Sequence, residues 1–219
     1  FKFFKVEFNM SFDYKKAHEF AVQEWNESIQ ERICDIIRIP SQSPLFDPEV
    51  LTNGLQEKVL DVALKWIDQQ GIKGLTCRVE TAEGRTPLLF IDIPSTDGTD
   101  KTVLVYSHLD KQPPMLPWAE GLDPYTPVIR SSADHKGNPC TKLYGRAGAD
   151  DSYGVFATIS AVKAVQAQGL PHGRVVGLIE FCEESGSFDL PYYLNKLKPE
   201  LGNPDLLICL DSGCGDFER

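Results

Sequence analysis

The sequence lacks a long apolar run. No window of its 219 residues approaches the roughly 20 consecutive apolar residues that a membrane-spanning helix needs. The first ten residues, FKFFKVEFNM, alternate Phe with Lys, a pattern compatible with an edge strand, and lack the continuous apolar core of a signal peptide. We therefore expect no membrane partner.

Paired cysteines are also missing. The six cysteines are scattered without a C-x-x-C pair, and several stand inside apolar runs, where a thiol behaves as a small hydrophobe. This distribution is typical of a reducing compartment rather than of a disulfide-stapled secreted domain. We expect a cytoplasmic protein.

Basic residues are scarce relative to acidic ones. Lys and Arg number 22 against 32 Asp and Glu, which gives a net charge of −10. The basic residues form no cluster of the kind that contacts phosphates, so we expect no nucleic-acid partner.

The apolar residues that are present, 42% of the chain, alternate between helical and strand patterns along the sequence. Helical spacing predicts helices over His18–Ile39, Glu49–Gln70, Ser152–Gln168 and Leu190–Leu197. Apolar β-type runs predict strands over Leu75–Glu80, Pro87–Ile93, Thr102–Ser107, Val128–Ser131, Arg174–Cys182 and Leu206–Leu210. The remainder of Gln112–Cys140 is rich in Pro and Gly and reads as irregular. Apolar strands alternating with helices indicate an α/β domain whose central sheet is covered on both faces.

Acidic residues follow three of the predicted strands. The strand Thr102–Ser107 leads into His108 and Asp110. The strand Arg174–Cys182 leads into the adjacent pair Glu183 and Glu184, and the strand Leu206–Leu210 leads into Asp211. Ligands of open α/β sheets bind at the carboxyl ends of the strands, so these side chains could share one cleft. A second acidic pair, Asp150-Asp151, stands at the start of a predicted helix.

One histidine among several carboxylates makes a plausible divalent-metal site, because zinc accepts both imidazole nitrogen and carboxylate oxygen. Each motif alone also has an ordinary structural explanation: a hydrogen-bonded His–Asp pair, a helix N-cap at Asp150-Asp151, solvated turn residues at Glu183-Glu184 and Asp211. A calcium site is disfavoured by His108, because calcium prefers oxygen ligands. The joint occurrence of the motifs favours the metal site.

Several segments together resemble one family, the co-catalytic zinc peptidases that include carnosinase, cytosolic nonspecific dipeptidase, glutamate carboxypeptidase, aminoacylase and succinyl-diaminopimelate desuccinylase. The segments that carry the resemblance are IRIPSQSP, VLVYSHLDKQPP, the W…DPY…P stretch at Trp118–Pro127, KLYGRAGADDSYG, EFCEESGS and LICLDSG. The resemblance implies a three-layer sandwich with a mixed, mostly parallel sheet.

The resemblance also implies a ligand set for two zinc ions, with Mn²⁺ or Co²⁺ as possible substitutes. His108, Asp150 and Asp211 would hold one ion, and Asp150, as the bridging ligand, would hold the other together with Glu184. A cis peptide bond is expected between Asp150 and the next residue.

Two further residues receive catalytic roles from the same resemblance. Glu183 would be the general base, and Asp110 would orient His108. No substrate-binding residue is assigned.

The chain departs from the family pattern in two ways. Ala147, Ser152 and Tyr153 replace residues of the usual GRGxxDDKG motif. The family also has an inserted lid domain and a returning segment with a final histidine ligand, a role that none of the other histidines fits by motif: His18, His135 and His172. We expect residues 1–219 to be the N-terminal part of the catalytic domain, with weak metal binding and little activity alone, and the full-length protein to be a homodimer.

We expect a dinuclear-zinc metallopeptidase that hydrolyses dipeptides or the C-terminal residues of short peptides. An N-acyl amino acid deacylase with the same site is the first alternative. A non-catalytic relative or fragment is the second, and the presence of Glu183 argues against it.

Overall fold

A five-stranded mixed sheet forms the centre of the molecule. The computed structural model describes residues 11–96, 98–134 and 136–211, and its main sheet has the strand order β1-β2-β6-β3-β7. These strands are β1 (Thr76–Glu80), β2 (Leu88–Ile93), β3 (Thr102–His108), β6 (Arg174–Glu180) and β7 (Leu206–Cys209). The strand β3 pairs in parallel with both β6 and β7, whereas β2 is antiparallel to both of its neighbours.

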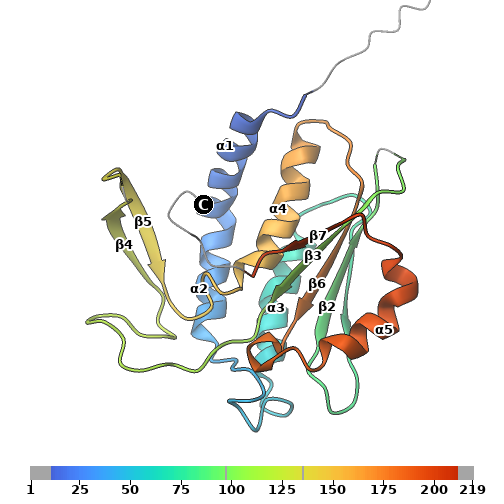
Figure 1. Cartoon of the computed structure of the whole chain (residues 1–219). Coiled ribbons are helices and arrows are strands. Elements are labelled where there is room, and N and C mark those ends of the chain that lie inside the picture. The colour runs from blue at the N-terminus through green and yellow to red at the C-terminus, as the bar shows by residue number, and fades with distance from the viewer. Residues whose placement is uncertain (1–10, 97, 135, 212–219) are drawn as a thin grey trace, which may run out of the picture.

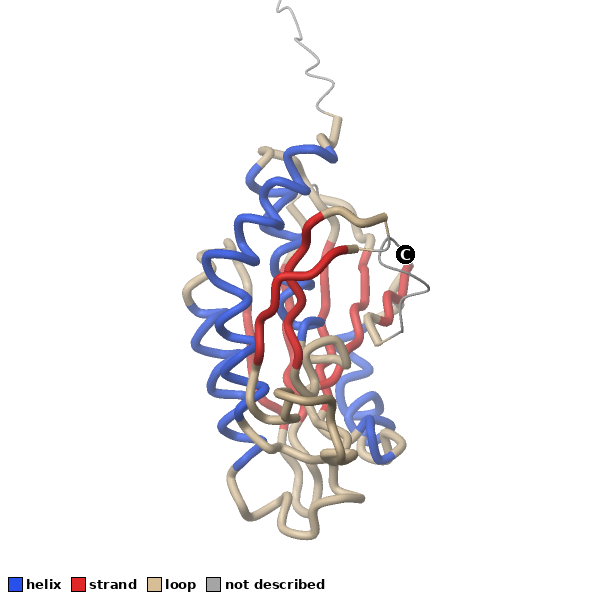
Figure 2. Tube along the Cα trace, turned by 90° about the vertical axis from the view of Figure 1, so that its left-hand side faces the viewer, coloured by secondary structure: helices blue, strands red, loops and turns tan. Residues whose placement is uncertain are grey.

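Helices cover the sheet on both faces, which confirms the expected three-layer arrangement (Figures 1 and 2). One face carries α1 (Tyr14–Glu24), a π-helical turn (Trp25–Ile29), α2 (Gln30–Arg38), α3 (Leu55–Asp68) and α4 (Tyr153–Ala167), and the other carries α5 (Leu190–Leu201). Among the described residues, no helix has the length and apolar character that crossing a membrane would require.

The strand β2 shows how the sequence builds two cores. Its residues point alternately to opposite faces of the sheet. Leu89 and Ile91 are fully buried in the core shared with α2, α3 and α4, and Leu88 and Phe90 are buried in the smaller core under α5. Because both faces are covered, this strand is apolar at nearly every position instead of alternating with polar residues.

The edge strand β7 differs from the others in exposure. Its residues Leu206 and Leu207 are 52% and 56% exposed, although both are large and apolar. Within the described part of the chain, β7 pairs with β3 on one side only.

Three expectations are corrected at the level of single elements. The second helix begins at Leu55 instead of Glu49, because Gly54 has a left-handed φ of 72° and ends a series of turns. The strand β5 (Pro139–Tyr144) pairs with β4 (Val128–Ala133) in a separate hairpin where only one strand was expected. Helix α5 continues to Leu201 beyond its predicted end. The N-terminal residues 1–10, including the possible edge strand, lie outside the described residues.

The strand β3 and helix α4 approach each other closely at Gly154. This contact places the start of α4 directly over Ser107, next to the end of β3. A Cβ atom added at Gly154 would lie 2.3 Å from Ser107 Cβ and 2.6 Å from Ser107 Oγ. The glycine therefore permits a helix–strand distance that any side chain would increase.

We predict that Gly154→Ala lowers the free energy of unfolding by about 1–3 kcal/mol, the usual cost of overpacking. Gly148→Ala is the matched control, because its Cβ would meet its nearest neighbour, Gly145 O, at an ordinary 3.5 Å. Urea unfolding followed by circular dichroism measures both. Equal stability of the two variants would contradict the close contact.

Candidate metal centre

The expected site residues gather where the three parallel strands end. His108 is the last residue of β3 and is fully buried. Asp211 follows β7, and Glu183 and Glu184 lie in a 3₁₀ turn (Glu183–Ser185) that follows β6. Asp150 comes from the loop before α4. The parallel pairing of β3 with its two neighbours brings these carboxyl ends to the same edge of the sheet, as the sequence predicted.

The His108 imidazole is the centre of the group. Its Nε2 lies 3.1 Å from Asp150 Oδ1, 3.7 Å from Glu183 Oε2 and 3.9 Å from Asp211 Oδ1. Three carboxylates therefore surround one ring nitrogen, and they come from three separate parts of the sequence.

Asp110 connects the end of β3 to the 3₁₀ turn Glu183–Ser185, the acidic turn. Its Oδ1 lies 3.4 Å from His108 Nδ1, on the opposite side of the ring from Asp150. The same carboxylate accepts hydrogen bonds from the backbone N–H groups of Glu183, at 3.2 Å, and Glu184, at 3.1 Å. This fully buried acid thus holds both the histidine and the backbone of the two glutamates.

Two sets of side chains have ligand atoms within 4.8 Å of one another, as a bound metal ion requires. One is His108, Asp150 and Glu184; the other is His108, Asp151 and Asp211. The second set contains Asp151, to which the sequence analysis gave no ligand role. The Asp150-Asp151 peptide bond is cis, as the family resemblance implied.

Asp151 is fully buried, unlike its neighbour Asp150. Its Oδ2 accepts a hydrogen bond from the His108 backbone N–H at 3.1 Å, and its Oδ1 is buried without a partner among the described residues. The N-cap of α4 is Ser152 rather than either aspartate. The helix-cap explanation of this acidic pair is therefore wrong.

The proximity of these groups changes their proton affinities. Burial raises the pKa of Glu183 to about 7 and that of Asp151 to about 7. Burial alone would lower the pKa of His108, but the carboxylates of Asp110 and Asp150 more than offset this and raise it to about 11. Without a cation, the site is thus a cluster of acids that retains protons around a charged imidazole.

A divalent cation fits this donor set. Glu184 Oε1 and Asp151 Oδ1 are buried acceptors without hydrogen-bond partners in the described chain, and leaving such atoms unpaired is costly unless a cation or water meets them. One imidazole nitrogen with several carboxylate oxygens is a ligand set that zinc accepts. Manganese and cobalt accept the same ligand types.

Two residues next to the expected site were missed by the sequence analysis. Lys111 is fully buried, and its Nζ donates to the backbone carbonyl of Ile36 at 2.5 Å and to that of Ile39. Gln112 donates from Nε2 to Glu184 Oε2. The sequence does indicate Gln112: in the segment HLDKQ the polar residues 108, 110 and 112 recur at the spacing of an extended strand, which puts their side chains on one face.

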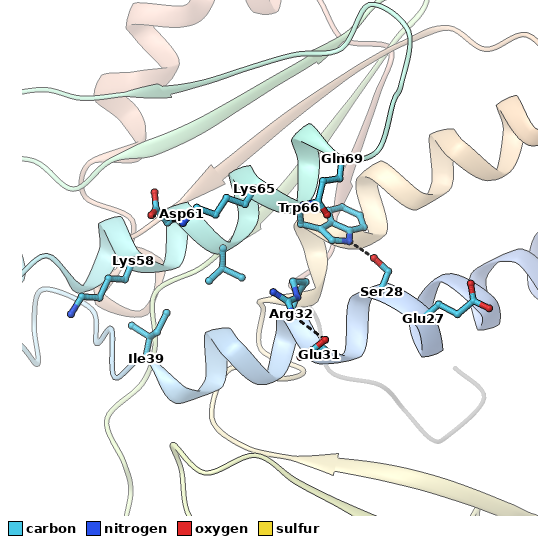
Figure 3. A pocket seen from close by; sticks show the side chains of 11 residues that line it. Glu27, Ser28, Glu31, Arg32, Ile39, Lys58, Asp61, Lys65, Trp66 and Gln69 are labelled. Carbon is cyan, nitrogen blue, oxygen red and sulfur yellow. Dashed lines mark hydrogen bonds and ion pairs between the residues drawn. The ribbon is translucent and has the colours of Figure 1, made fainter.

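A separate groove of about 660 Å³ lies between α2 and α3, and none of the cluster's residues lines it (Figure 3). Four of its six charged side chains pair with each other: Arg32 with Glu31 at 3.0 Å, and Lys65 with Asp61 at 3.1 Å. No histidine is among the residues that line it, so we place the chemistry at the strand ends.

The other described histidines take no part in the cluster. His18 lies on α1, and His172 hydrogen-bonds to Gln166 and to the Gly173 carbonyl. His135 lies outside the described residues.

The fold and the cluster together define the class of α/β domains that carry a carboxylate-rich metal centre at the carboxyl ends of parallel strands. Within this class, the chain belongs to the Peptidase family M20/M25/M40, whose family model matches residues 104–216. The matched residues include His108 and every acid of the cluster, and the family resemblance is confirmed.

Individual relatives are similar over part of their length. An uncharacterized metallohydrolase of Methanocaldococcus jannaschii is 28% identical over 84% of this chain and 44% of its own. The Cys-Gly metallodipeptidase DUG1 of Saccharomyces cerevisiae is 32% identical over 75% of this chain and 34% of its own. The crystal structure of human carnosine dipeptidase 1 superposes with a TM-score of 0.66 and 25% identity, over 90% of this chain and 41% of that one. This chain thus spans less than half the length of the relatives it matches.

We predict that the metal-free protein loses stability as the pH rises from 5 to 8. The folded-state pKa values of Glu183 and Asp151, both about 7, lie above the ordinary values of 4.5 and 3.8. The folded state therefore retains protons that the unfolded state has released, and this advantage disappears as the pH rises through 7. The contribution of His108 to stability depends on pH in the same direction. It is fully present below the ordinary pKa of 6.5 and is lost as the pH rises towards the folded-state pKa of about 11.

Zinc at 100 times its dissociation constant should add about 2.7 kcal/mol of stability at pH 8. Melting temperatures with chelator and with added zinc, at pH 5 and pH 8, test both statements. A melting temperature independent of zinc would count against the metal centre.

Proposed function

We propose that this chain carries the metal ligands and the general base of a dinuclear-zinc metallopeptidase that hydrolyses dipeptides or the C-terminal residues of short peptides. The observation that supports this best is that one buried histidine groups with carboxylates from three other parts of the sequence, in two sets whose ligand atoms lie within 4.8 Å of one another. The names of two relatives, a Cys-Gly metallodipeptidase and a carnosine dipeptidase, favour dipeptides.

For the ligands, we propose that His108, Asp150 and Asp211 hold one zinc ion and that Asp150 also bridges to a second ion held by Glu184. The grouping of Asp151 with His108 and Asp211 makes this residue an alternative ligand of the first ion. When bound, the zinc pair would polarise the scissile carbonyl and lower the pKa of a water towards about 7.

The remaining steps belong to the chain's own side chains. Glu183 lies 3.7 Å from His108 Nε2 and is partly exposed, so it faces both the cluster and an incoming substrate. Its pKa of about 7 suits a group that first accepts a proton from water and then donates it to the leaving amine. Asp110 keeps the imidazole and the Glu183 backbone in place through the contacts described above.

The activity, substrates and assembly of the whole protein are also part of the proposal. We propose that the groups that bind the two ends of the substrate, and a final histidine ligand of the second zinc ion, belong to the regions of the relatives that this chain does not span. On this basis the 219 residues alone would bind metal weakly and turn over little substrate. A homodimer and a cytoplasmic location complete the proposed description.

Two other functions use the same residues differently. A deacylase would remove an acyl group from N-acyl amino acids with the same ligands and base, and a non-catalytic relative would keep the fold without the chemistry. The retention of base and ligands together disfavours the non-catalytic relative, since a protein without turnover has no need of Glu183 beside the ligands. Parallel assays on Cys-Gly and on N-acetyl amino acids separate the peptidase from the deacylase.

We predict that Glu183→Gln abolishes turnover in the complete gene product and leaves metal content unchanged. The amide has the same size but cannot accept the proton, and removing a general base costs about 10²–10⁴-fold in rate. Glu31→Gln is the matched control, because Glu31 is a highly exposed acid on α2. Peptide hydrolysis and elemental analysis measure the two properties, and wild-type turnover by Glu183→Gln would assign the base elsewhere.

We predict that Asp150→Ala removes most of the bound zinc, because this carboxylate is the one shared by both proposed sites. Asp61→Ala on the exposed face of α3 serves as the control. Zinc titration and elemental analysis of this chain provide the measurement. Undiminished zinc binding by Asp150→Ala would refute the bridging assignment.

A further inference from the structure

The five residues 108–112 prolong β3 with alternating contacts. His108, Asp110 and Gln112 all touch the acid cluster: His108 contacts Asp150, Asp110 accepts from the acidic turn, and Gln112 donates to Glu184. The intervening residues face away from it. Leu109 is buried in the main core, and Lys111 hydrogen-bonds to the carbonyls at the end of α2. The segment therefore presents one polar face to the site.

The backbone around Gln112 is held from both sides. Lys111 forms a parallel bridge with Gln42, and its carbonyl accepts from Ser43 N at 3.0 Å. Two prolines, Pro113 and Pro114, follow Gln112, and a residue before proline is restricted to extended backbone. The Gln112 side chain thus starts from a backbone with little freedom to move.

Glu184 is fixed at two points. Its backbone N–H donates to Asp110 Oδ2 at 3.1 Å, and its Oε2 accepts from Gln112 Nε2. The next residue, Ser185, is tied to Ser43 by a 2.6 Å hydroxyl contact. The other carboxylate oxygen, Glu184 Oε1, is buried and has no partner among the described residues. A carboxylate oxygen of Glu184 lies within 4.8 Å of the ligand atoms of His108 and Asp150.

We propose that Gln112 is a positioning residue for Glu184: its amide holds one carboxylate oxygen so that the other is presented to the metal. This inference rests on the proposed function, because it gives Glu184 a cation to bind. A hydrogen-bonded partner of this kind fixes the orientation of a metal-binding carboxylate, and its loss typically weakens metal affinity 10- to 100-fold.

A simple packing role for Gln112 makes a different prediction, and two substitutions separate the explanations. Gln112→Met keeps the length of the side chain but removes the donor, whereas Gln112→Ala removes both. The matched control is Gln23→Ala, because Gln23 also donates to a glutamate, Glu27, at 3.0 Å, but lies exposed on α1. If only packing matters, Gln112→Met should behave as wild type.

The experiment titrates this chain and the three variants with Co²⁺ alone and records the visible absorption of the bound ion, which reports its ligand geometry. Thermal unfolding of each variant checks that the fold is retained. We expect Gln112→Met and Gln112→Ala to lose 10- to 100-fold in Co²⁺ affinity and to show an altered spectrum, and Gln23→Ala to match the wild type.

Each other outcome overturns the inference. Wild-type affinity and spectrum in both Gln112 variants would show that Glu184 needs no help from the amide. A loss in Gln112→Ala alone would assign Gln112 a packing role. Because this chain alone is expected to bind metal weakly, the wild-type titration is carried to saturating Co²⁺ before any variant is compared. No uptake by the wild-type chain under those conditions would reject the metal centre and the inference together.

Discussion

The parallel pairing of β3 with both β6 and β7 is the constraint on which the rest of the site depends. Parallel strands end at the same edge of a sheet, so His108, the acidic turn after β6 and Asp211 are brought together without any of them being close in sequence. Antiparallel pairing at either contact would move one of these groups to the opposite end of the sheet. The antiparallel strand β2 lies beyond β6, where it provides core rather than ligands.

Bringing acids together has an electrostatic cost, and the local structure offsets this cost to a different extent for each acid. Asp110 is buried but accepts two backbone hydrogen bonds, from the N–H groups of Glu183 and Glu184, which offset the cost of burying its polar atoms. Asp150 is partly exposed and its pKa is lowered by the hydrogen bond to His108. Asp151 accepts one backbone hydrogen bond from His108, but for both Asp151 and Glu183 burial dominates and raises the pKa to about 7. A bound cation beside these two acids would offset the cost of burying them.

The amino-acid pattern was sufficient for the layers and for the position of the site, and insufficient for several contacts. Strand ends and helix periodicity are local properties, so β3, β6, β7 and the convergence of their acids could be read directly. The hairpin partner β5 escaped notice because its sequence, PCTKLY, lies in a Pro- and Gly-rich region and lacks an apolar face. Spacing could place Gln112 on the same face as His108, but the partners of Asp151, Lys111 and Gln112 lie 40 or more residues away, and no spacing rule identifies them.

The exposed apolar strand β7 has a consequence for how the metal centre is built. An edge strand with large apolar side chains readily recruits another segment of polypeptide, because its outer backbone groups are available for pairing. Asp211 stands two residues beyond the end of β7, at the rim of the acid cluster. A segment that paired with this edge would lie beside Asp211, so the exposed edge of the sheet and the acid cluster border each other on the molecule.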